Sequence, residues 1–220
     1  MTLAQRVADQ FRTVKEIAEY YPTRPSQYSD LVRWVQLHGS TTLSAAMPWW
    51  PFPVIDFVDR HLPRGSRVLE FGGGGSTLWL LERGHQVTSV EHDQQWSEVL
   101  LDKVPAGHVV SVPVAASGEI TSPVEPGFFD SYVAVADGFD DEALDLVIVD
   151  GRARVECGRR ARPKVKRGGM LLLDDSDRER YLPLVGELGS WERRDFTGLK
   201  PGSGGPRHSS IFIRPAHDGA

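Results

Sequence analysis

Four acidic side chains each stand at the end of a short apolar run that is typical of a buried strand. They are Glu70, Glu91, Asp150 and Asp174. In open α/β sheets ligands bind outside the carboxyl ends of the strands, so these carboxylates are candidates for one shared cleft. Two carboxylates at the ends of adjacent strands are costly unless something uses them. Their positions therefore predict a site for a ligand that donates hydrogen bonds.

A glycine run, residues 72–75, follows Glu70 and leads into residues 78–82, which have the spacing of a helix opening. Glycine lets the backbone approach a ligand closely and tolerates positive φ. A strand, a glycine turn and a helix predict half of a nucleotide-binding βαβ unit, with an ordinary glycine-rich loop as the alternative. Glu91 follows about 20 residues later, where dinucleotide folds place the acid that accepts from ribose hydroxyls. Trp96 is expected beside a purine or in the core.

Composition narrows the class of protein. The chain has 220 residues, 40% of them hydrophobic and 25% charged, which fits one globular domain with a sizeable core. A formal net charge of -5 argues against nucleic-acid and anionic-membrane partners. The single cysteine, Cys157, excludes an internal disulfide and fits a reducing compartment. No apolar run is long enough to span a bilayer and the N-terminus lacks a signal-peptide layout, so we expect a cytoplasmic location.

The elements that must position these residues alternate between strands and helices. Apolar spacing predicts helices over residues 2–20 and 29–37, which form an N-terminal cap, residues 1–50, that covers the cleft or only packs on the core. The Trp49–Trp50 corner lines a pocket or orients the next helix. A core domain, residues 51–215, ends in a strand pair and is followed by a tail, residues 216–220.

Within the core domain, residues 109–115 are predicted as the third strand and residues 117–140 as a long connection with one helix at most. The order of elements predicts an α/β sandwich with a largely parallel sheet.

These motifs resemble those of class I S-adenosylmethionine-dependent methyltransferases. The resemblance covers roughly residues 64–214, in several ordered pieces. It implies a Rossmann-like three-layer sandwich with a seven-stranded, mostly parallel sheet and an antiparallel last strand. Ser76 stands where a third spaced glycine is common, but a small residue still permits close approach. The matching pieces are residues 70–77, 90–91, 146–150 and 168–174.

By this resemblance the cofactor is S-adenosylmethionine, with its methionine portion near Glu70, Gly72 and Gly74 and its ribose on Glu91. Dehydrogenases are the nearest rival, but position 77 is threonine where their glycine fingerprint continues. An acid before the glycines would also repel a pyrophosphate. The expected cofactor-binding residues are Glu70, Gly72, Gly74, Ser76, Glu91, His92 and Trp96.

The methyl acceptor is expected above the fourth and fifth strand ends. An oxygen acceptor needs a base, for which the candidates are Asp150, Asp174 and His208. Trp49, Trp50, Arg152 and Asp175 are the expected substrate-binding residues. Asp150, Asp174 and Asp175 also resemble the carboxylates that hold Mg²⁺ in metal-dependent O-methyltransferases. Arg152 and Arg154 would satisfy these acids without a metal, so a magnesium site is not favoured.

The leading hypothesis is methyl transfer to a small organic acceptor, with oxygen preferred. The alternatives are carbon or nitrogen methylation, a reaction in which the bound sulfonium acts only electrostatically, and a non-catalytic binding module. Partners are expected to be small molecules, without nucleic acid or membrane. The oligomeric state is open, and a homodimer is compatible with the sequence.

Overall fold

The computed structural model describes residues 3–37, 39–202 and 204–217, without the side chains of residues 3–11. Short 3₁₀ turns, η1 (Tyr21–Thr23) and η2 (Pro25–Gln27), connect the first two helices. The helices are α1 (Leu3–Tyr20), α2 (Tyr28–Gln36), α3 (Thr42–Ala45), α4 (Phe52–His61), α5 (Gly75–Glu82), α6 (Gln94–Leu101), α7 (Asp130–Ala134), α8 (Arg154–Ala161) and α9 (Leu182–Glu187). The strands are β1 (Arg67–Phe71), β2 (Gln86–Glu91), β3 (Val109–Ser111), β4 (Thr121–Ser122), β5 (Glu125–Phe128), β6 (Leu144–Val149), β7 (Val165–Asp174), β8 (Glu192–Gly198) and β9 (Arg207–Ile213).

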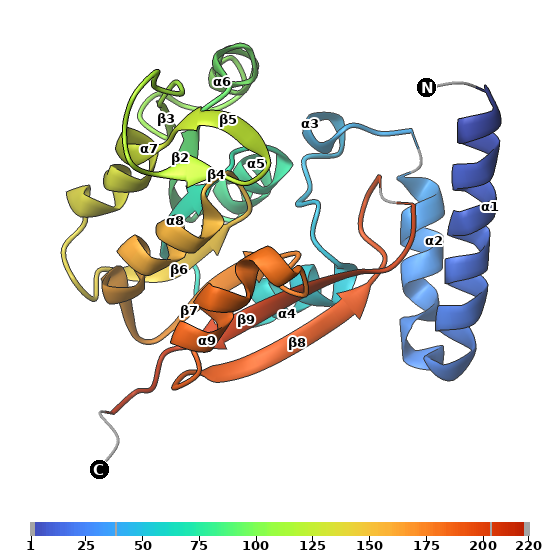
Figure 1. Ribbon diagram of the computed structural model, residues 1–220. Helices are drawn as coiled ribbons and strands as arrows, with labels where there is room; N and C mark the ends of the chain where they lie inside the picture. Colours follow the sequence, from blue (N-terminus) through green and yellow to red (C-terminus); the bar gives the residue numbers. More distant parts are fainter. Residues whose placement is uncertain (1–2, 38, 203, 218–220) are drawn as a thin grey trace.

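Seven strands form one sheet in the order β3-β2-β1-β6-β7-β9-β8 (Figure 1). The pairs from β3 to β7 are parallel, whereas β9 runs antiparallel to both of its neighbours. This confirms the predicted mostly parallel sheet with an antiparallel last strand. The carboxyl ends of β1, β2, β6 and β7 meet at one edge, because parallel strands point the same way.

Helices cover both faces of the sheet and bury a core on each. Helices α7, α8 and α9 pack on one face, around Phe71, Val149 and Phe212. Helices α4 and α5 pack on the other face, around Ile148 and Leu172. Alternate residues of the central strands enter opposite cores, which explains why β6 is apolar almost throughout.

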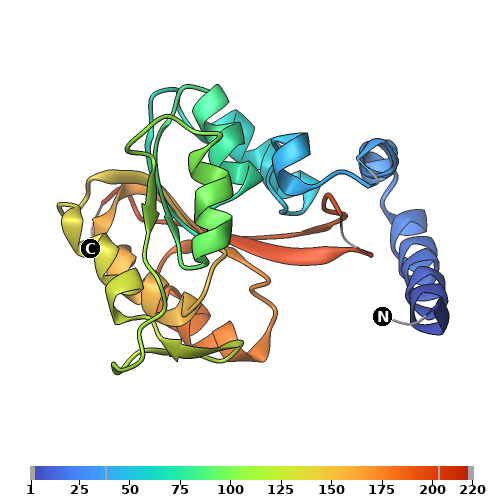
Figure 2. The ribbon, with the colours of Figure 1, turned by 90° about the horizontal axis from the view of Figure 1, so that it is seen from above.

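The N-terminal helices lie beside the sheet rather than over its centre. Figures 1 and 2 show α1 and α2 next to the far end of the β8–β9 pair. The hydroxyl of Tyr20 donates to the carbonyl of Thr197 over 2.5 Å, so α1 is attached to the end of β8. These helices occupy the region of the predicted cap, whose domain boundary stays a prediction.

Two segments differ from the sequence-based expectation. The third strand ends at Ser111 instead of extending to residue 115, because Pro113 has no N–H for a strand ladder. The connection 117–140 contains a small hairpin, β4–β5, in addition to helix α7. Of the predicted tail, residues 218–220 lie outside the described residues. No described helix has the length and apolar character needed to cross a bilayer.

Candidate functional site

The glycine turn lies between β1 and α5, and at Gly72, Gly73 and Gly75 it is packed too closely to accept side chains. Gly72 has a φ of 96°, which favours glycine. A Cβ on Gly72 would also come within 2.8 Å of the backbone of Gly151, just past the end of β6. A Cβ on Gly75 would collide with the carbonyl oxygens of Thr42 and Met47. The turn is therefore a bare stretch of backbone between two neighbouring strand ends and α3.

Glu70 lies beneath this turn and is fully buried. Its Oε2 accepts from the hydroxyls of Thr77 (2.6 Å) and Ser89 (2.9 Å). Its Oε1 has no hydrogen-bond partner among the described residues. Burial raises the pKa of Glu70 to about 7, although hydroxyl donors including Ser76 act in the opposite direction. Glu70 is a buried acid with one unsatisfied oxygen and no paired cation among the described residues.

Glu91 lies at the end of β2, and one of its carboxylate oxygens accepts hydrogen bonds from the turn that follows. Its Oε1 accepts from the backbone N–H groups of His92 (2.8 Å) and Asp93 (2.9 Å). Its Oε2 makes no hydrogen bond to a described residue and remains available to a ligand.

The ring of His92 is fixed between two acids. Nδ1 lies 2.7 Å from Glu91 Oε1, and Nε2 lies 2.9 Å from Glu125 Oε2. Burial acts to lower the pKa of His92, but Glu91 and Glu125 outweigh it and raise that pKa. Arg152 donates to the same Glu125 oxygen over 2.6 Å, so the β4–β5 hairpin is tied to both β2 and β6.

Trp96 and Thr42 brace the rim of the turn. The indole N–H of Trp96 donates to the carbonyl of Gly73 over 2.8 Å. The hydroxyl of Thr42 accepts from the backbone N–H of Gly75 over 2.7 Å, at the start of α5. Both contacts hold the glycine backbone in place and leave the turn facing the cleft.

Beside the turn lies a pocket of 340 Å³, within the range of roughly 300–1,000 Å³ common for ligand sites. The fully buried Glu70 lies outside its lining. The pocket combines backbone from the glycine turn with side chains from the ends of β2 and β6. Its lining consists of Thr42, Trp49, Gly72, Gly73, Gly74, Gly75, Ser76, Glu91, His92, Asp93, Trp96, Asp150, Gly151 and Arg152.

A cluster of opposite charges lies at the ends of β6 and β7. Arg154 Nη2 donates to Asp150 Oδ1 over 2.9 Å, and Arg154 Nη1 donates to the carbonyl of Asp174 over 2.5 Å. Lys200 Nζ donates to Asp174 Oδ2 over 3.2 Å, and Ser209 donates to Asp174 Oδ1 over 2.6 Å. The Asp174 carboxylate therefore lies beside Lys200, Ser209 and Arg154. The side chain of Asp150, by contrast, is 25% exposed.

The two acids of this cluster titrate in opposite directions. Burial, and then the neighbouring Asp174 carboxylate, raise the pKa of Asp150 well above its ordinary value. Burial also acts to raise the pKa of Asp174, but Lys200 and Arg154 outweigh it and hold that pKa below its ordinary value. At neutral pH Asp174 is ionised, and Asp150 is the member of the pair that can take up a proton.

The carboxylates near Asp150 do not fit a divalent metal ion. Arg154 lies between Asp150 and Asp174, and it approaches Asp175 Oδ2 to 3.8 Å. Lys200 occupies the other side of Asp174. A metal ion would have to displace two cations that already neutralise its donors. Among the described residues, no group of three or more His, Cys, Asp and Glu side chains is placed to hold a metal.

Four of the predicted substrate or catalytic residues lie away from the pocket lining, namely Trp50, Asp174, Asp175 and His208. Trp50 is fully buried and packs edge-on against Trp79 in the α4–α5 core. Asp175 pairs with Arg178 over 2.7 Å. His208 lies 2.9 Å from the Ser176 hydroxyl. Neighbouring Ser209 reaches Asp174, so His208 points to the opposite face of the sheet from that acid.

Three further residues belong to the site although the sequence motifs do not include them: Thr42, Glu125 and Lys200. Thr42 and Glu125 lie in segments whose hydrophobic residues have no clear period. Lys200 has one local signal, since it is the one charged residue between Phe196 and Arg207.

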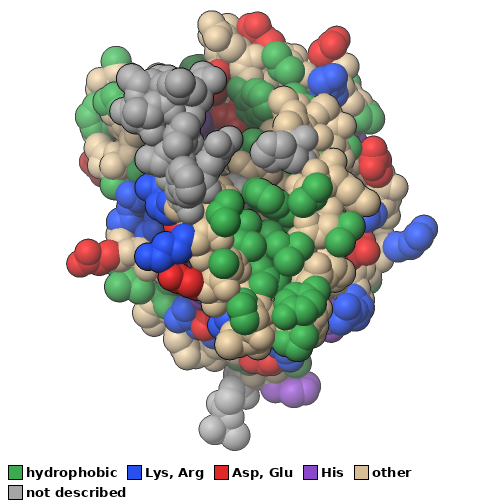
Figure 3. Space-filling view, turned by 90° about the vertical axis from the view of Figure 1, so that its right-hand side faces the viewer, with side chains coloured by type: hydrophobic (Ala, Val, Ile, Leu, Met, Phe, Trp, Pro, Cys, Tyr) green, Lys and Arg blue, Asp and Glu red, His purple; other side chains and the backbone are tan. Residues whose placement is uncertain are grey.

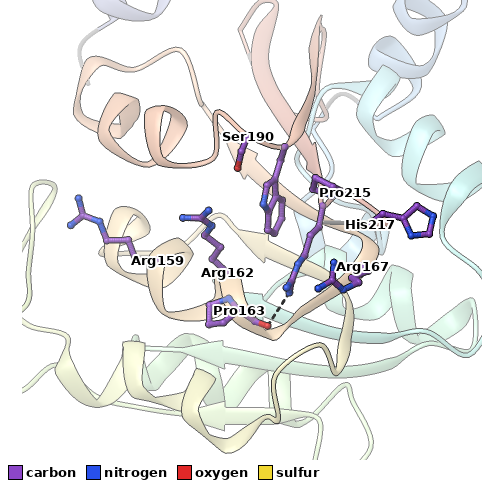
Figure 4. Close-up of a pocket in the computed structure, with 9 residues that line it drawn as sticks. Arg159, Arg162, Pro163, Arg167, Ser190, Pro215 and His217 are labelled. Atoms are coloured by element: carbon purple, nitrogen blue, oxygen red, sulfur yellow. Dashed lines mark hydrogen bonds between the residues drawn. The ribbon is translucent and has the colours of Figure 1, made fainter. Parts of the chain in front are cut away.

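A larger pocket, of 720 Å³, lies at the other end of α8. Figure 4 shows Arg159, Arg162 and Arg167 around it, near His217. It has no carboxylate and no glycine turn in its lining, and Arg159 is already bonded to Glu187. We therefore place the chemistry in the smaller pocket at the strand ends.

The strand order decides the fold family. A parallel β3-β2-β1-β6-β7 array is followed by antiparallel β9 and then β8, which agrees with the mostly parallel seven-stranded sheet and antiparallel last strand that the resemblance implies. The chain has the Rossmann-like methyltransferase fold. This confirms the resemblance at the level of the fold.

Structural comparison found several solved structures with some similarity to the chain. A methyltransferase-like protein from Silicibacter pomeroyi is 29% identical, over 68% of this chain and 79% of that one, with a TM-score of 0.47. A TehB-like SAM-dependent methyltransferase from Corynebacterium glutamicum is 16% identical, over 88% and 99%, with a TM-score of 0.48. A methyltransferase from Pyrococcus furiosus is 19% identical, over 87% and 98%, with a TM-score of 0.46.

No protein-family model and no curated protein sequence matches the chain. The fold assignment rests on the strand order of this chain rather than on the superpositions.

Proposed function

We propose that the chain transfers the methyl group of S-adenosylmethionine to a small organic acceptor, with an oxygen atom as the first choice. One observation carries the proposal. The bare glycine turn, Glu91 and Asp150 line a single pocket at the ends of three neighbouring strands. A ligand there meets open backbone on one side and carboxylates on the other.

The charge of the donor side supports this choice of cofactor. Glu70 is buried without a paired cation, and Glu91 Oε2 is free among the described residues. A pyrophosphate would be repelled by these acids, whereas an ammonium or a ribose hydroxyl would be attracted. The glycine turn and Ser76 would hold the methionine portion, and Glu91 would hold the ribose. When bound, the cofactor supplies an electrophilic methyl group next to its sulfonium.

Asp150 is the proposed general base. It lines the pocket, and burial beside Asp174 raises its pKa, which favours uptake of a proton. Arg154 fixes its orientation through the 2.9 Å bond to Oδ1. Asp174 stays ionised beside it and raises its proton affinity, while Lys200 and Arg154 stabilise that second charge. Trp49 and Arg152 line the same pocket and would contact the acceptor.

The test is a methyl-transfer assay on metabolite extracts with isotope-labelled S-adenosylmethionine, read by mass spectrometry with and without exhaustive chelation. We expect label in a small molecule at an oxygen atom, with or without chelator. Label at carbon or nitrogen would change the acceptor atom only. Bound cofactor with no labelled product from any extract would leave a binding module and contradict the enzyme proposal. Loss of the product on chelation would contradict the metal-free site. The cytoplasmic location stays a prediction.

A further inference from the structure

The ring of His92 faces a carboxylate oxygen at each of its two nitrogens. Nδ1 lies 2.7 Å from Glu91 Oε1 and Nε2 lies 2.9 Å from Glu125 Oε2, although only the second contact has the alignment of a hydrogen bond. Ionised carboxylates only accept hydrogen bonds, whereas a neutral imidazole carries a proton on one nitrogen and a lone pair on the other. A neutral ring would therefore turn a lone pair toward one of the two oxygens. Only the imidazolium, with a proton on both nitrogens, fits both acids.

The groups around the ring favour this charged form. Glu91 of β2 and Glu125 of β5 approach its two nitrogens, and Arg152 lies behind Glu125, where its Nε donates to the same oxygen over 2.6 Å. Tyr132 of α7 packs edge-on against the ring, and the His92 side chain is only 9% exposed. The Tyr132 phenol stays neutral, because burial raises its pKa well above the ordinary value. Burial acts to lower the pKa of His92, but the two acids outweigh it and raise that pKa.

Glu125 also fastens the β4–β5 hairpin, which forms a two-stranded sheet of its own. Residues 121–128 are all described, and Glu125 is the one whose side chain hydrogen-bonds to residues at the ends of the main sheet. Burial acts to raise the pKa of Glu125, but Arg152 and His92 outweigh it and lower that pKa, so this carboxylate is ionised at neutral pH. Figures 1 and 2 place the hairpin on the opposite side of the molecule from α1 and α2, and Figure 3 looks onto the α1 and α2 side. The N-terminal helices therefore give the hairpin no support.

We propose that Glu125 is a positioning residue for the methyl donor, an inference that rests on the proposed function. Glu91 and His92 line the pocket, whereas Glu125 acts on it through His92. Glu125 holds His92 as an imidazolium. The imidazolium and the N–H groups of the following turn hold Glu91 Oε1, which leaves Glu91 Oε2 for the ribose of S-adenosylmethionine.

The same contacts make donor binding sensitive to the protonation of His92. When pH rises through the pKa of His92, the ring loses one proton, and one of its nitrogens turns a lone pair toward a carboxylate. The contact with Glu91 or the contact with Glu125 then becomes repulsive, and the orientation of Glu91 is lost. We expect donor affinity to fall as pH rises through this raised pKa, and to fall at lower pH in a protein without the Glu125 charge. Glu70 titrates in both proteins and does not affect the comparison.

The test is a histidine NMR titration of the full chain without ligand, followed by calorimetry with S-adenosylmethionine across the same pH range. The variants are Glu125→Gln and the matched control Glu119→Gln, which removes an exposed acid from the same connection. The His92 signal is assigned by its loss in His92→Gln, and circular dichroism checks that each variant is folded. We expect a lower His92 pKa in Glu125→Gln than in the parent and in Glu119→Gln. We also expect Glu125→Gln to bind the donor about 10-fold more weakly, as for the loss of one hydrogen bond to a charged group.

Two results would overturn the inference and leave the proposed function intact. An equal His92 pKa in the parent and in Glu125→Gln would show that Glu125 does not hold the proton of the ring. A lowered His92 pKa with unchanged donor affinity would show that these contacts do not position Glu91. Absence of donor binding in the parent as well as in the variants would instead reject the proposed function, and the donor role of Glu125 with it.

Discussion

The acidic side chains at the two ends of the cleft differ in their partners. At the ends of β1 and β2, no described Lys or Arg side chain pairs with Glu70 or Glu91, and hydroxyl and backbone donors are their main partners. At the ends of β6 and β7, Asp150 and Asp174 share Arg154, and Lys200 adds a second cation. At the first end Glu70 has no described cation and Glu91 has only the His92 ring, whereas the acids of the second end are neutralised by Arg154 and Lys200.

This difference separates the roles of the two ends. A buried acid without a cation favours a ligand that brings positive charge, and S-adenosylmethionine carries an ammonium and a sulfonium. Asp150 and Asp174 are already paired with cations of the chain, so their charge does not require a metal ion. The repulsion between the two carboxylates raises the proton affinity of Asp150. We infer that the first end binds the donor and the second end performs proton transfer.

Removing Arg154 disrupts the ion pairs at the ends of β6 and β7. We expect this change to have the largest effect, a loss of unfolding free energy. Arg154→Met removes the ion-pair partner of Asp150 and leaves Asp174 with Lys200 as its cation, and breaking a buried ion pair costs about 3–5 kcal/mol of unfolding free energy. Urea denaturation measures the loss. Arg160→Met is the matched control on the same helix, since Arg160 is an exposed partner of Asp137 and its loss should leave the midpoint nearly unchanged. Equal midpoints for the two variants would contradict the internal neutralisation.

Asp150→Asn tests the role of the same end in catalysis. Loss of a general base lowers kcat by about 10²–10⁴-fold. Donor affinity, measured by calorimetry, should change little because the glycine turn and Glu91 remain. His208→Ala is the comparison variant, and we expect a kcat close to that of the parent because His208 points to the opposite face. A larger kcat loss for His208→Ala than for Asp150→Asn would reverse the assignment.

Glu70→Gln tests the donor end with a smaller expected effect. Hydrogen bonds to charged groups contribute about 1.5–3 kcal/mol, so the affinity for S-adenosylmethionine should fall by about 10–100-fold. The Glu70 pKa of about 7 lies above its ordinary value, so Glu70 stabilises the fold most at low pH, and that contribution is lost as pH rises through about 7.

The same pKa sets the pH dependence of binding. A cationic ligand favours the ionised form of Glu70, so the parent should bind more tightly as pH rises from about 5 to about 7. In Glu70→Gln this rise should be absent. A rise of equal size in both proteins would assign the titration to another group.

The sequence predicts the strand ends better than the contacts between them. Strand-end acids and the glycine run are visible because apolar runs and glycines have local signatures. Trp49 and Trp50 are neighbours of the same type, and only the packing on Trp79 decides that Trp50 enters the core. Lys200 reaches Asp174 through the antiparallel β8–β9 pair, a contact between residues far apart in the chain. No local pattern encodes such a pairing.

The most direct test of the account is calorimetric titration of the parent protein with S-adenosylmethionine, repeated below pH 7 in two buffers of different ionisation enthalpy. We expect saturable binding to one site, with proton release that reveals the ionisation of Glu70. No heat of binding at high micromolar concentration, or binding without proton release, would contradict the claim that the donor end is completed by a cationic ligand.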